Sequence, residues 1–301
     1  MQTDIGRPAA TGRHIPGDPV DEILAAYRLS GPWQRLEATG VANRIYATQD
    51  VVLRVATDHP DAIVDARTES IAAPVARQAS ILTPQLVAFD DSRMFVDRPF
   101  SLWERVHGET LGLLDLCGSI REGVWREVGQ QISRLHDRVR SCPDPNGYLD
   151  TPGRELRLDL VLQRFADSGH ASSDDVREIE NLNSDLSPFI SRGGVPNCFL
   201  HNDLHEWNIM CGRKGGLLAL IDWGDAGWGD PTLDFAAVPL DSISAVLEGY
   251  DRTERLGDYP EARFVWDRLD NALDDAIDDP KSGVPVSDYR RFLDRTRVTR
   301  R

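Results

Sequence analysis

The sequence predicts an α+β protein with two lobes: a small N-terminal lobe built on an antiparallel sheet with one main helix, and a larger, mainly helical C-terminal lobe. Three observations predict this class. Strand-like segments surround one helical segment up to residue 106, helical periodicity dominates from residue 107, and a short hairpin pattern interrupts the helical part. We therefore expect an N-terminal lobe over residues 1–106 and a C-terminal lobe over residues 107–301.

The N-terminal lobe begins with a loose arm, a short helix and a pair of strands. Residues 1–18 hold Gly, Pro and Thr without periodicity, which is typical of a mobile terminus. A short helix is expected over residues 20–29. The stretch "NRIYATQDVVLRVA" then predicts two strands joined through "TQD", because successive side chains of "VVLRVA" alternate between two faces.

One helix and two further strands complete this lobe. The stretch "PDAIVDARTESIAAPVARQ" is helical in composition, with Pro60 near its start and Pro74 near its end or at a kink. The stretches "QLVAFD" and "RMFVDRPFSLWERV" follow as strand candidates, joined through the turn "DDS". Strands around one helix describe a small sheet-based lobe.

The C-terminal lobe is helical around a central hairpin. Apolar residues at spacings of three and four predict one buried helix face, formed by Ile120, Val124, Val128, Ile132, Leu135 and Val139. Residues 150–190 and 241–295 are also helical in tendency. Between them, "FLHNDLHEWNIMC", the turn "GRKGG" and the apolar run "LLALIDW" predict a hairpin that brings Asp222 back alongside Asn208.

The composition limits the classes of binding partner and the cellular compartment that we expect. The 301 residues include 34 basic and 49 acidic side chains, a net charge of −15, and the excess lies mostly in residues 107–301. Such a surface repels nucleic acid and anionic lipid, and it attracts small cations. The four cysteines are scattered, and no apolar run reaches the length of a membrane span. We expect a cytoplasmic protein that binds neither nucleic acid nor membrane.

One short stretch, "HNDLHEWN", carries most of the candidate chemistry. On an extended strand, His201, Asp203 and His205 would share one face and, with Asp222, could serve as metal ligands of a hydrolase. In a loop, Asp203 and Asn208 would instead serve a nucleotide and its magnesium ion. The two interpretations predict different enzymes.

The spacing of the acidic residues favours the nucleotide. Phosphoryl transfer needs an acceptor hydroxyl held in line with the phosphate and cations on the β- and γ-phosphates. Asp203 can serve the hydroxyl, while Asn208 and Asp222 offer the hard oxygen ligands that Mg²⁺ prefers. The order and spacing of these three residues suit that chemistry.

The same residues carry a family resemblance. "HNDLHEWN" followed by "IDWGDAGWGDPTLDFA" resembles the aminoglycoside phosphotransferase family, which has a protein-kinase-like fold. The motif H-x-D-x-x-x-x-N is matched over residues 201–208, I-D-[WF]-[GE]-x from Ile221, and G-D-P-x-x-D-[LF]-A over residues 229–236.

The resemblance implies a role for each motif residue. Asp203 would orient the acceptor hydroxyl and help to deprotonate it, while Asn208 and Asp222 would bind Mg²⁺ for ATP or GTP as co-substrate. His201 would brace the loop, and Asp234, with Asp230, would fix the backbone of the lobe. His205 is left with two interpretations, one near the phosphate and one in packing.

The first lobe shows the resemblance less fully. The stretch "TGVANRIYATQDVVLRVA" resembles the nucleotide-covering loop and the strand after it, but Gly40 is the single glycine of that loop. Asn43 is a candidate contact to the phosphates. Arg54 stands where kinases place the lysine that touches the α- and β-phosphates. Because arginine and lysine are not interchangeable, Arg54 either takes that role or marks a modified site.

Two further nucleotide-site residues follow from the resemblance. Glu69, in the helical stretch, is either the ion-pair partner of Arg54 or an ordinary exposed helix glutamate. The segment "LWERVHGETL" resembles the hinge between lobes, where the base bonds to main-chain groups. We place the hinge at Glu104 to Val106.

The acceptor is expected to be a cation. The family includes antibiotic-inactivating kinases and metabolic kinases for choline, homoserine or sugar-like compounds, and an acidic lobe would attract a polycation. Candidate contacts are Glu206, Asp225, Asp274, Asp275 and Asp278. The acids of the run "DNALDDAIDD" are equally well explained as a solvated helix face.

The sequence thus predicts an O-phosphotransferase that moves the γ-phosphate to a hydroxyl of a cationic antibiotic and so confers resistance. The acceptor would be an aminoglycoside or a tuberactinomycin-type cyclic peptide. A small-metabolite kinase of the same fold is the first alternative. A nucleotide-binding pseudoenzyme and a metal-dependent hydrolase are alternatives of other classes.

Overall fold

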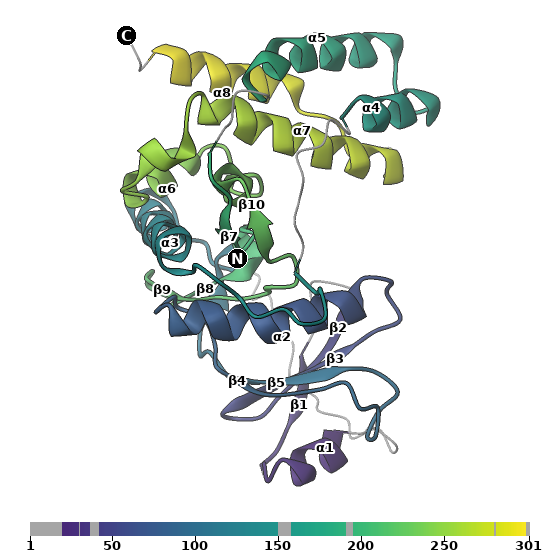
Figure 1. The fold of residues 1–301 in the computed structure, drawn as a ribbon, viewed down its shortest axis with the longest axis vertical. Helices are drawn as coiled ribbons and strands as arrows, with labels where there is room; N and C mark the ends of the chain where they lie inside the picture. Colours follow the sequence, from purple (N-terminus) through teal and green to yellow (C-terminus); the bar gives the residue numbers. More distant parts are fainter. Residues whose placement is uncertain are drawn as a thin grey trace, which may run out of the picture.

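The computed structural model describes residues 20–29, 31–36, 42–149, 158–190, 195–279 and 281–298. The expected arm over 1–18 and Gly40 lie outside these residues. The ribbon in Figure 1 shows a sheet-based part at one end, a layer of helices at the other, and a mixed central part between them.

The N-terminal part is a five-stranded antiparallel sheet in the order β1-β2-β3-β5-β4. Its strands are β1 (Gln34–Leu36), β2 (Asn43–Ala47), β3 (Val51–Ala56), β4 (Leu86–Asp90) and β5 (Phe100–Glu104). The predicted pair β2–β3 is confirmed, and β4 also pairs with β5. The prediction that the second of these strands starts at Arg93 is wrong: Arg93 has a φ of +61°, which a strand residue does not adopt, and β5 begins only at Phe100, so the connection is longer than the turn "DDS". Alternation places Leu53 and Val55 of β3 in a core shared with Phe100 and Leu102 of β5.

Two helices cover this sheet on opposite faces (Figure 1). Helix α1 (Val20–Ala26) packs Val20 and Ile23 against the outer face. Helix α2 (Ala62–Gln78) covers the face that looks toward the rest of the molecule, and its small alanines allow a close approach. Pro74 lies inside α2, about one turn before its end.

The central part is built on a close pair of helices. Helix α3 (Gly118–Arg138) crosses α6 (Ile243–Gly249) at backbone contact, because a Cβ atom on Gly129 would lie 2.0 Å from the Val246 carbonyl oxygen. The predicted apolar face of α3 is buried from Val124 onward. Ile120 is 50% exposed, so its predicted burial is wrong: it stands in the first turn of α3, beside the hairpin turn at Gly215.

Short strands in the central part hold the candidate loop. Strands β6 (Glu109–Thr110), β8 (Ile209–Cys211) and β9 (Leu217–Leu220) form one sheet, and β7 (Cys198–Leu200) pairs with β10 (Gly227–Gly229). The predicted hairpin is confirmed by the pairing of Ile209 with Leu220. The Ile221 amide also donates to the Asn208 carbonyl at 3.0 Å, which places Asp222 next to Asn208 along the ladder.

The remaining helices form the layer farthest from the N-terminal sheet (Figure 1). They are α4 (Leu158–Asp167), α5 (Ser173–Ile190), α7 (Pro260–Asp278) and α8 (Val286–Val298). They agree with the helical tendency expected on either side of the hairpin. None of the described helices is both long and apolar enough to span a membrane.

Candidate active site

A cavity of about 800 Å³ lies between the N-terminal sheet and the central part. Its walls come from the sheet, from α2, from the connection after β5, and from the loops around residues 207–210 and 221–225. Most of the sequence-predicted site residues line it: Asn43, Arg54, Glu69, Glu104, Val106, Asn208, Asp222 and Asp225. The fold therefore brings together residues separated by up to 182 positions of the chain.

The connection between the two parts forms one end of this cavity. Strand β5 ends at Glu104, and the Arg105 amide donates to the Asp50 carbonyl at 2.8 Å. Glu104 and Val106 both line the cavity, as a hinge requires. At Gly108 the chain passes so close to β8 that a Cβ atom would lie 2.5 Å from the Cys211 carbonyl oxygen.

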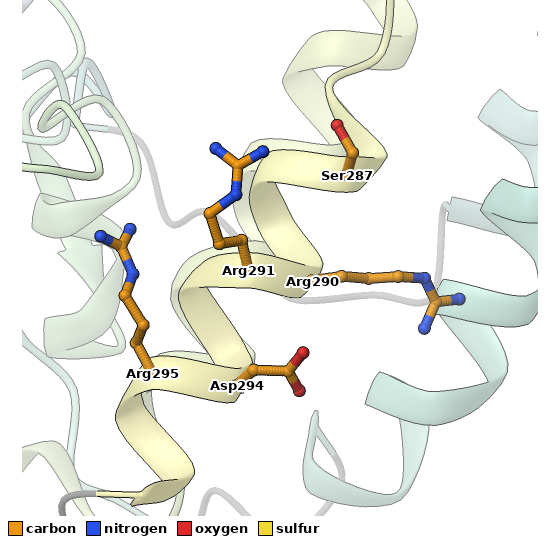
Figure 2. A pocket seen from close by; sticks show the side chains of 5 residues that line it. All are labelled: Ser287, Arg290, Arg291, Asp294 and Arg295. Carbon is orange, nitrogen blue, oxygen red and sulfur yellow. The ribbon is translucent and has the colours of Figure 1, made fainter.

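A second hollow, on the solvent face of α8, has a different character (Figure 2). It is lined by Ser287, Arg290, Arg291, Asp294 and Arg295. Arg290 extends toward one side and pairs with Asp185 at 3.1 Å, while Arg291 extends toward the other and pairs with Asp288 at 3.1 Å. Arg295 lies on the same side as Arg291, so Arg290 points away from both, and the three guanidinium groups do not gather around one ligand.

Arg54 links three elements at the centre of the large cavity. From β3, its Nη1 atom donates to both oxygens of Glu69 on α2, at 2.6 and 2.7 Å. Its Nη2 atom donates to Oδ1 of Asp222 at 2.9 Å. The Arg54 side chain is 14% exposed. Burial disfavours its charge, but the attraction of Asp222 and Glu69 prevails and raises its pKa, so Arg54 stays a cation.

Glu69 is the buried centre of this network and not an exposed helix residue. Burial raises the pKa of Glu69, and the contact with Arg54 opposes that effect. Its carboxylate also takes a hydrogen bond from the backbone of Trp223. The Trp223 indole is fully buried and donates to Thr83 Oγ1 at 3.1 Å, so it anchors the Asp222 segment in the core.

Asp222 has a backbone conformation that few residues other than glycine adopt. Its φ of +66° is in the left-handed region, as is the φ of +68° at Asn202 in the facing loop. Such strain persists where the surroundings fix it, and it concentrates at functional sites. Arg54 lowers the pKa of Asp222, which keeps its carboxylate ionised in the cavity.

Asp203 is held by Asn208 through two hydrogen bonds. The Asn208 amide nitrogen donates to Asp203 Oδ2 at 2.7 Å and to the Asp203 carbonyl at 2.9 Å. Because the nitrogen faces Asp203, the amide oxygen of Asn208 points away from it. His205 also contacts Asp203, with 3.3 Å between Nε2 and Oδ2, and this contact raises the pKa of His205 although burial works against it.

His201 has the geometry of a brace. Its ring is fully buried, Nε2 contacts the Ile221 carbonyl at 3.1 Å, and Nδ1 accepts from the Asp203 amide at 3.4 Å. It therefore joins the Asp203 loop to the strand that ends before Asp222. Burial lowers the pKa of His201, which keeps the ring neutral.

A second, deeper network fixes the start of the loop. Asp234 accepts from the Asn202 amide at 2.6 Å and contacts His136 Nε2 at 2.8 Å. The other ring nitrogen of His136 contacts the Tyr250 hydroxyl at 2.9 Å. All three side chains are buried, and they connect the loop to the α3–α6 pair. Sequence reasoning anticipated Asp234 as a backbone anchor but not its partners.

The donor set fits Mg²⁺ better than a hydrolytic metal. His201 faces the core, so it does not share a face with Asp203 and His205 as the hydrolase interpretation requires. Among the described residues, no cluster of three or more His, Cys, Asp or Glu side chains is arranged to hold a metal. The Asp222 carboxylate and the Asn208 amide oxygen are two hard donors, and Mg²⁺ commonly completes its shell with phosphates and water.

The structure places one of the predicted acceptor contacts in the cavity wall and the others away from it. Asp225 lines the cavity, whereas Glu206 pairs with Arg121 on α3. Asp274 pairs with Arg164 of α4 at 3.1 Å. Asp274, Asp275 and Asp278 all belong to α7 in the far helical layer and do not line the described cavity (Figure 1). Their contact with an acceptor remains a prediction.

The cavity also has acidic residues that sequence reasoning missed. Asp61 and Asp65, at the start of α2, also line it. Burial, Asp222 and Asp61 raise the pKa of Asp65 to about 6. A Cβ atom on Gly224 would lie 2.7 Å from the Asp65 Cβ, so α2 rests directly on the Asp222 segment. The available signal in the sequence was the helix that starts after Pro60, soon after the strand that holds Arg54.

A family model and solved structures match this chain. The model described as Phosphotransferase enzyme family matches residues 34–275. The aminoglycoside phosphotransferase APH(2'')-Ib, ADP-bound, has a TM-score of 0.62 at 15% identity, covering 93% of this chain and 97% of that one. The streptomycin–ATP–APH(2'')-IIa complex has a TM-score of 0.62 at 15% identity, covering 88% and 91%.

A different kind of kinase is also similar. A choline/ethanolamine kinase family protein from Mesorhizobium loti has a TM-score of 0.56 at 18% identity, covering 92% of both chains. No curated protein sequence matches this chain. The structural likenesses confirm the predicted bilobal, kinase-like α+β fold.

Proposed function

The chain belongs to the phosphotransferase enzyme family, and we propose that it transfers the γ-phosphate of ATP or GTP to a hydroxyl of a cationic small molecule. The observation that carries the proposal is the arrangement of Arg54, Asp222 and Asn208 around one cavity, with Asp203 bonded to Asn208. A cation, two oxygen donors for Mg²⁺ and a carboxylate near the acceptor are the groups that this reaction uses.

Each residue has a proposed part in the reaction. Main-chain groups of Glu104 to Val106 hold the base, and Arg54 and Asn43 contact the phosphates. Asn208 and Asp222 would hold Mg²⁺, which would neutralise charge on the phosphates. Asp203 orients the acceptor hydroxyl and accepts its proton.

The acceptor side supports a cation. Asp61, Asp65 and Asp225 line the cavity together with Asp222, whose carboxylate is paired with Arg54. Burial raises the pKa of Asp65 to about 6 together with repulsion from Asp222 and Asp61, and positive charge on the acceptor would relieve the repulsion. We therefore propose an aminoglycoside or a tuberactinomycin-type cyclic peptide as the acceptor, with resistance in the cytoplasm as the consequence.

A small-metabolite kinase is the second candidate. The similarity to a choline/ethanolamine kinase family protein favours it, since choline is also a cation with a hydroxyl. The two candidates differ in the charge of the acceptor. A polycation would use several of the cavity carboxylates, whereas a single charge would need one.

One screen tests both candidates. Purified wild type and Asp203→Ala would be incubated with Mg²⁺ and γ-labelled ATP or GTP, with a panel of aminoglycosides, cyclic basic peptides, choline, homoserine and sugars. We expect transfer by the wild type alone onto a cationic member. Transfer onto homoserine or a neutral sugar only would overturn the cationic acceptor, and no transfer onto any member would overturn the proposed function.

A further inference from the structure

His205 has three neighbours that the resemblance left without an explanation. Its Nδ1 atom lies 3.2 Å from the Trp207 amide nitrogen, and its Nε2 atom lies 3.3 Å from Asp203 Oδ2. Nε2 also lies 3.3 Å from the amide nitrogen of Asn208. The ring therefore touches both the proposed base and a proposed Mg²⁺ ligand.

The first of these contacts determines where the ring proton lies. The Trp207 amide is a donor, so Nδ1 of His205 must accept and carries no proton in this arrangement. The neutral ring then carries its proton on Nε2, the nitrogen that faces Asp203 Oδ2.

The contact between His205 and Asn208 is a consequence of sharing one acceptor. The amide nitrogen of Asn208 points its hydrogens at the carbonyl and Oδ2 of Asp203, at 2.9 and 2.7 Å. It is not an acceptor for His205 Nε2–H. The two nitrogens therefore lie side by side because both donate to Oδ2.

We propose that His205 is a positioning residue for phosphoryl transfer, which holds Oδ2 of Asp203 together with Asn208 so that Oδ1 faces the acceptor hydroxyl. The proposal rests on the proposed function. Within the described residues, Asp203 Oδ1 makes no hydrogen bond, while Oδ2 accepts from Asn208 Nδ2 at 2.7 Å and lies 3.3 Å from His205 Nε2. Two donors on one oxygen fix the carboxylate rotamer, which leaves the other oxygen correctly placed.

The transfer step then balances with His205 unchanged. The acceptor oxygen forms a bond to the γ-phosphorus while the bond from that phosphorus to the bridging oxygen of the nucleoside diphosphate breaks. The hydroxyl proton passes to Oδ1 of Asp203. His205 keeps its Nε2 proton throughout, so its effect is on geometry.

Two substitutions separate this role from simple capping of the short 3-10 helix Glu206–Asn208. His205 is the N-cap residue of that helix, with φ −107° and ψ 171°. His205→Asn places an amide oxygen where Nδ1 lies, which keeps the cap, but it has no atom at the position of Nε2. His205→Gln places an amide nitrogen near the position of Nε2 and loses the cap. His170→Asn, at an exposed histidine between α4 and α5, is the matched control.

We expect opposite results from the two variants. In the labelled-phosphate assay, His205→Asn should lower kcat about tenfold with the KM for nucleotide changed less than about twofold, and His205→Gln should keep kcat within about threefold. His170→Asn should match the wild type. Full activity in His205→Asn with loss in His205→Gln would show a capping role and overturn the proposal, as would equal kcat values in both variants.

A spectroscopic measurement keeps this test separate from the proposed function. In protein labelled with ¹⁵N-histidine, the His205 ring signals are those lost in His205→Asn. Protonation at Nε2 supports the proposal, and a neutral ring protonated at Nδ1 overturns it, whether or not an acceptor has been found. Absence of transfer by the wild type onto every acceptor would instead overturn the proposed function.

Discussion

The two sides of the cavity are held in different ways. On the nucleotide side, Arg54 bonds Glu69 and Asp222 at 2.9 Å or less, and it joins a strand, a helix and a loop that are far apart in the chain. On the proposed acceptor side, Asp203 and His205 lie two residues apart in one loop. The side chains of Asp203 and His205 are 31% and 37% exposed, whereas those of the Arg54–Glu69 pair are 14% and 6% exposed. Asp222, the second partner of Arg54, is 44% exposed.

This difference indicates which side is fixed by the fold. Buried charge pairs between separate elements are costly to break, because each partner would be left without compensation. The geometry of the nucleotide side is therefore fixed by the packing of α2 on the Asp222 segment. On the acceptor side, local hydrogen bonds hold the Asp203 and His205 side chains, while His201 and Asp234 anchor the backbone of their loop.

The largest expected effect comes from the acceptor side. Asp203→Ala should lower kcat about 10³-fold, because it removes the carboxylate that receives the hydroxyl proton. The Kd for Mg²⁺–nucleotide should change little, since Asp203 is not among the residues that contact the phosphates in the proposal. Single-turnover transfer and nucleotide titration would measure the two quantities. A comparable loss of both would mean that the two sides are not independent.

The next effect belongs to the nucleotide side. Asp222→Ala should weaken binding of Mg²⁺–nucleotide at least about tenfold, because it removes a charged oxygen ligand. It also leaves Arg54 with Glu69 as its sole carboxylate partner within this network. Calorimetry with and without Mg²⁺ would separate metal binding from nucleotide binding. Unchanged binding in Mg²⁺ would remove Asp222 from its proposed role.

The Asp203 loop was easier to predict from the sequence than the contact between Arg54 and Asp222. The residues of the Asp203 loop are adjacent in the chain, so their spacing alone indicated a shared site. The bond between Arg54 and Asp222 joins positions 168 residues apart, and neither periodicity nor charge indicates it. Most strands and helices were predictable because each has its own apolar period. The error at Ile120 lies in the first turn of α3, which extends beyond the elements that bury the rest of that helix face.

The acids of α7 illustrate the same limit. Their charge is plain in the sequence, but the direction in which a helix presents them depends on its neighbours. The structure pairs Asp274 with Arg164 of α4. Asp61 and Asp65 were missed, and they are the acids that the fold turns toward the cavity.

A third prediction tests the geometry of the Arg54 network. Arg54→Lys keeps the charge but offers one nitrogen in place of the two that now serve Glu69 and Asp222. We expect the KM for nucleotide to rise about tenfold, since one charged hydrogen bond is lost. Arg44→Lys, on the exposed face of the neighbouring strand, is the control. An unchanged KM would show that charge alone is enough.

The smallest expected effect is on the free energy of unfolding, and it comes from Asp65, at the boundary between the two sides. Its pKa is about 6 in the fold against an ordinary value of 3.8, so the folded state binds this proton more tightly than the unfolded state. The stability that protonation contributes is present below about pH 4 and is lost as the pH rises through about 6. At pH 7.5 an ionised Asp65 therefore lowers the free energy of unfolding. Asp65→Asn, which is always neutral, should raise it by about 1 kcal/mol after allowance for solvent screening.

The pH dependence distinguishes this cause from a general effect of charge. The difference between Asp65→Asn and wild type in urea unfolding should shrink as the pH falls from about 7.5 to about 4.5, because wild-type Asp65 becomes neutral. Asp97→Asn, at an exposed acid of the same sheet-based part, corrects for the loss of one negative charge. A constant difference across that range would contradict the raised pKa, and with it the argument that Asp65 and Asp222 repel each other across the cavity.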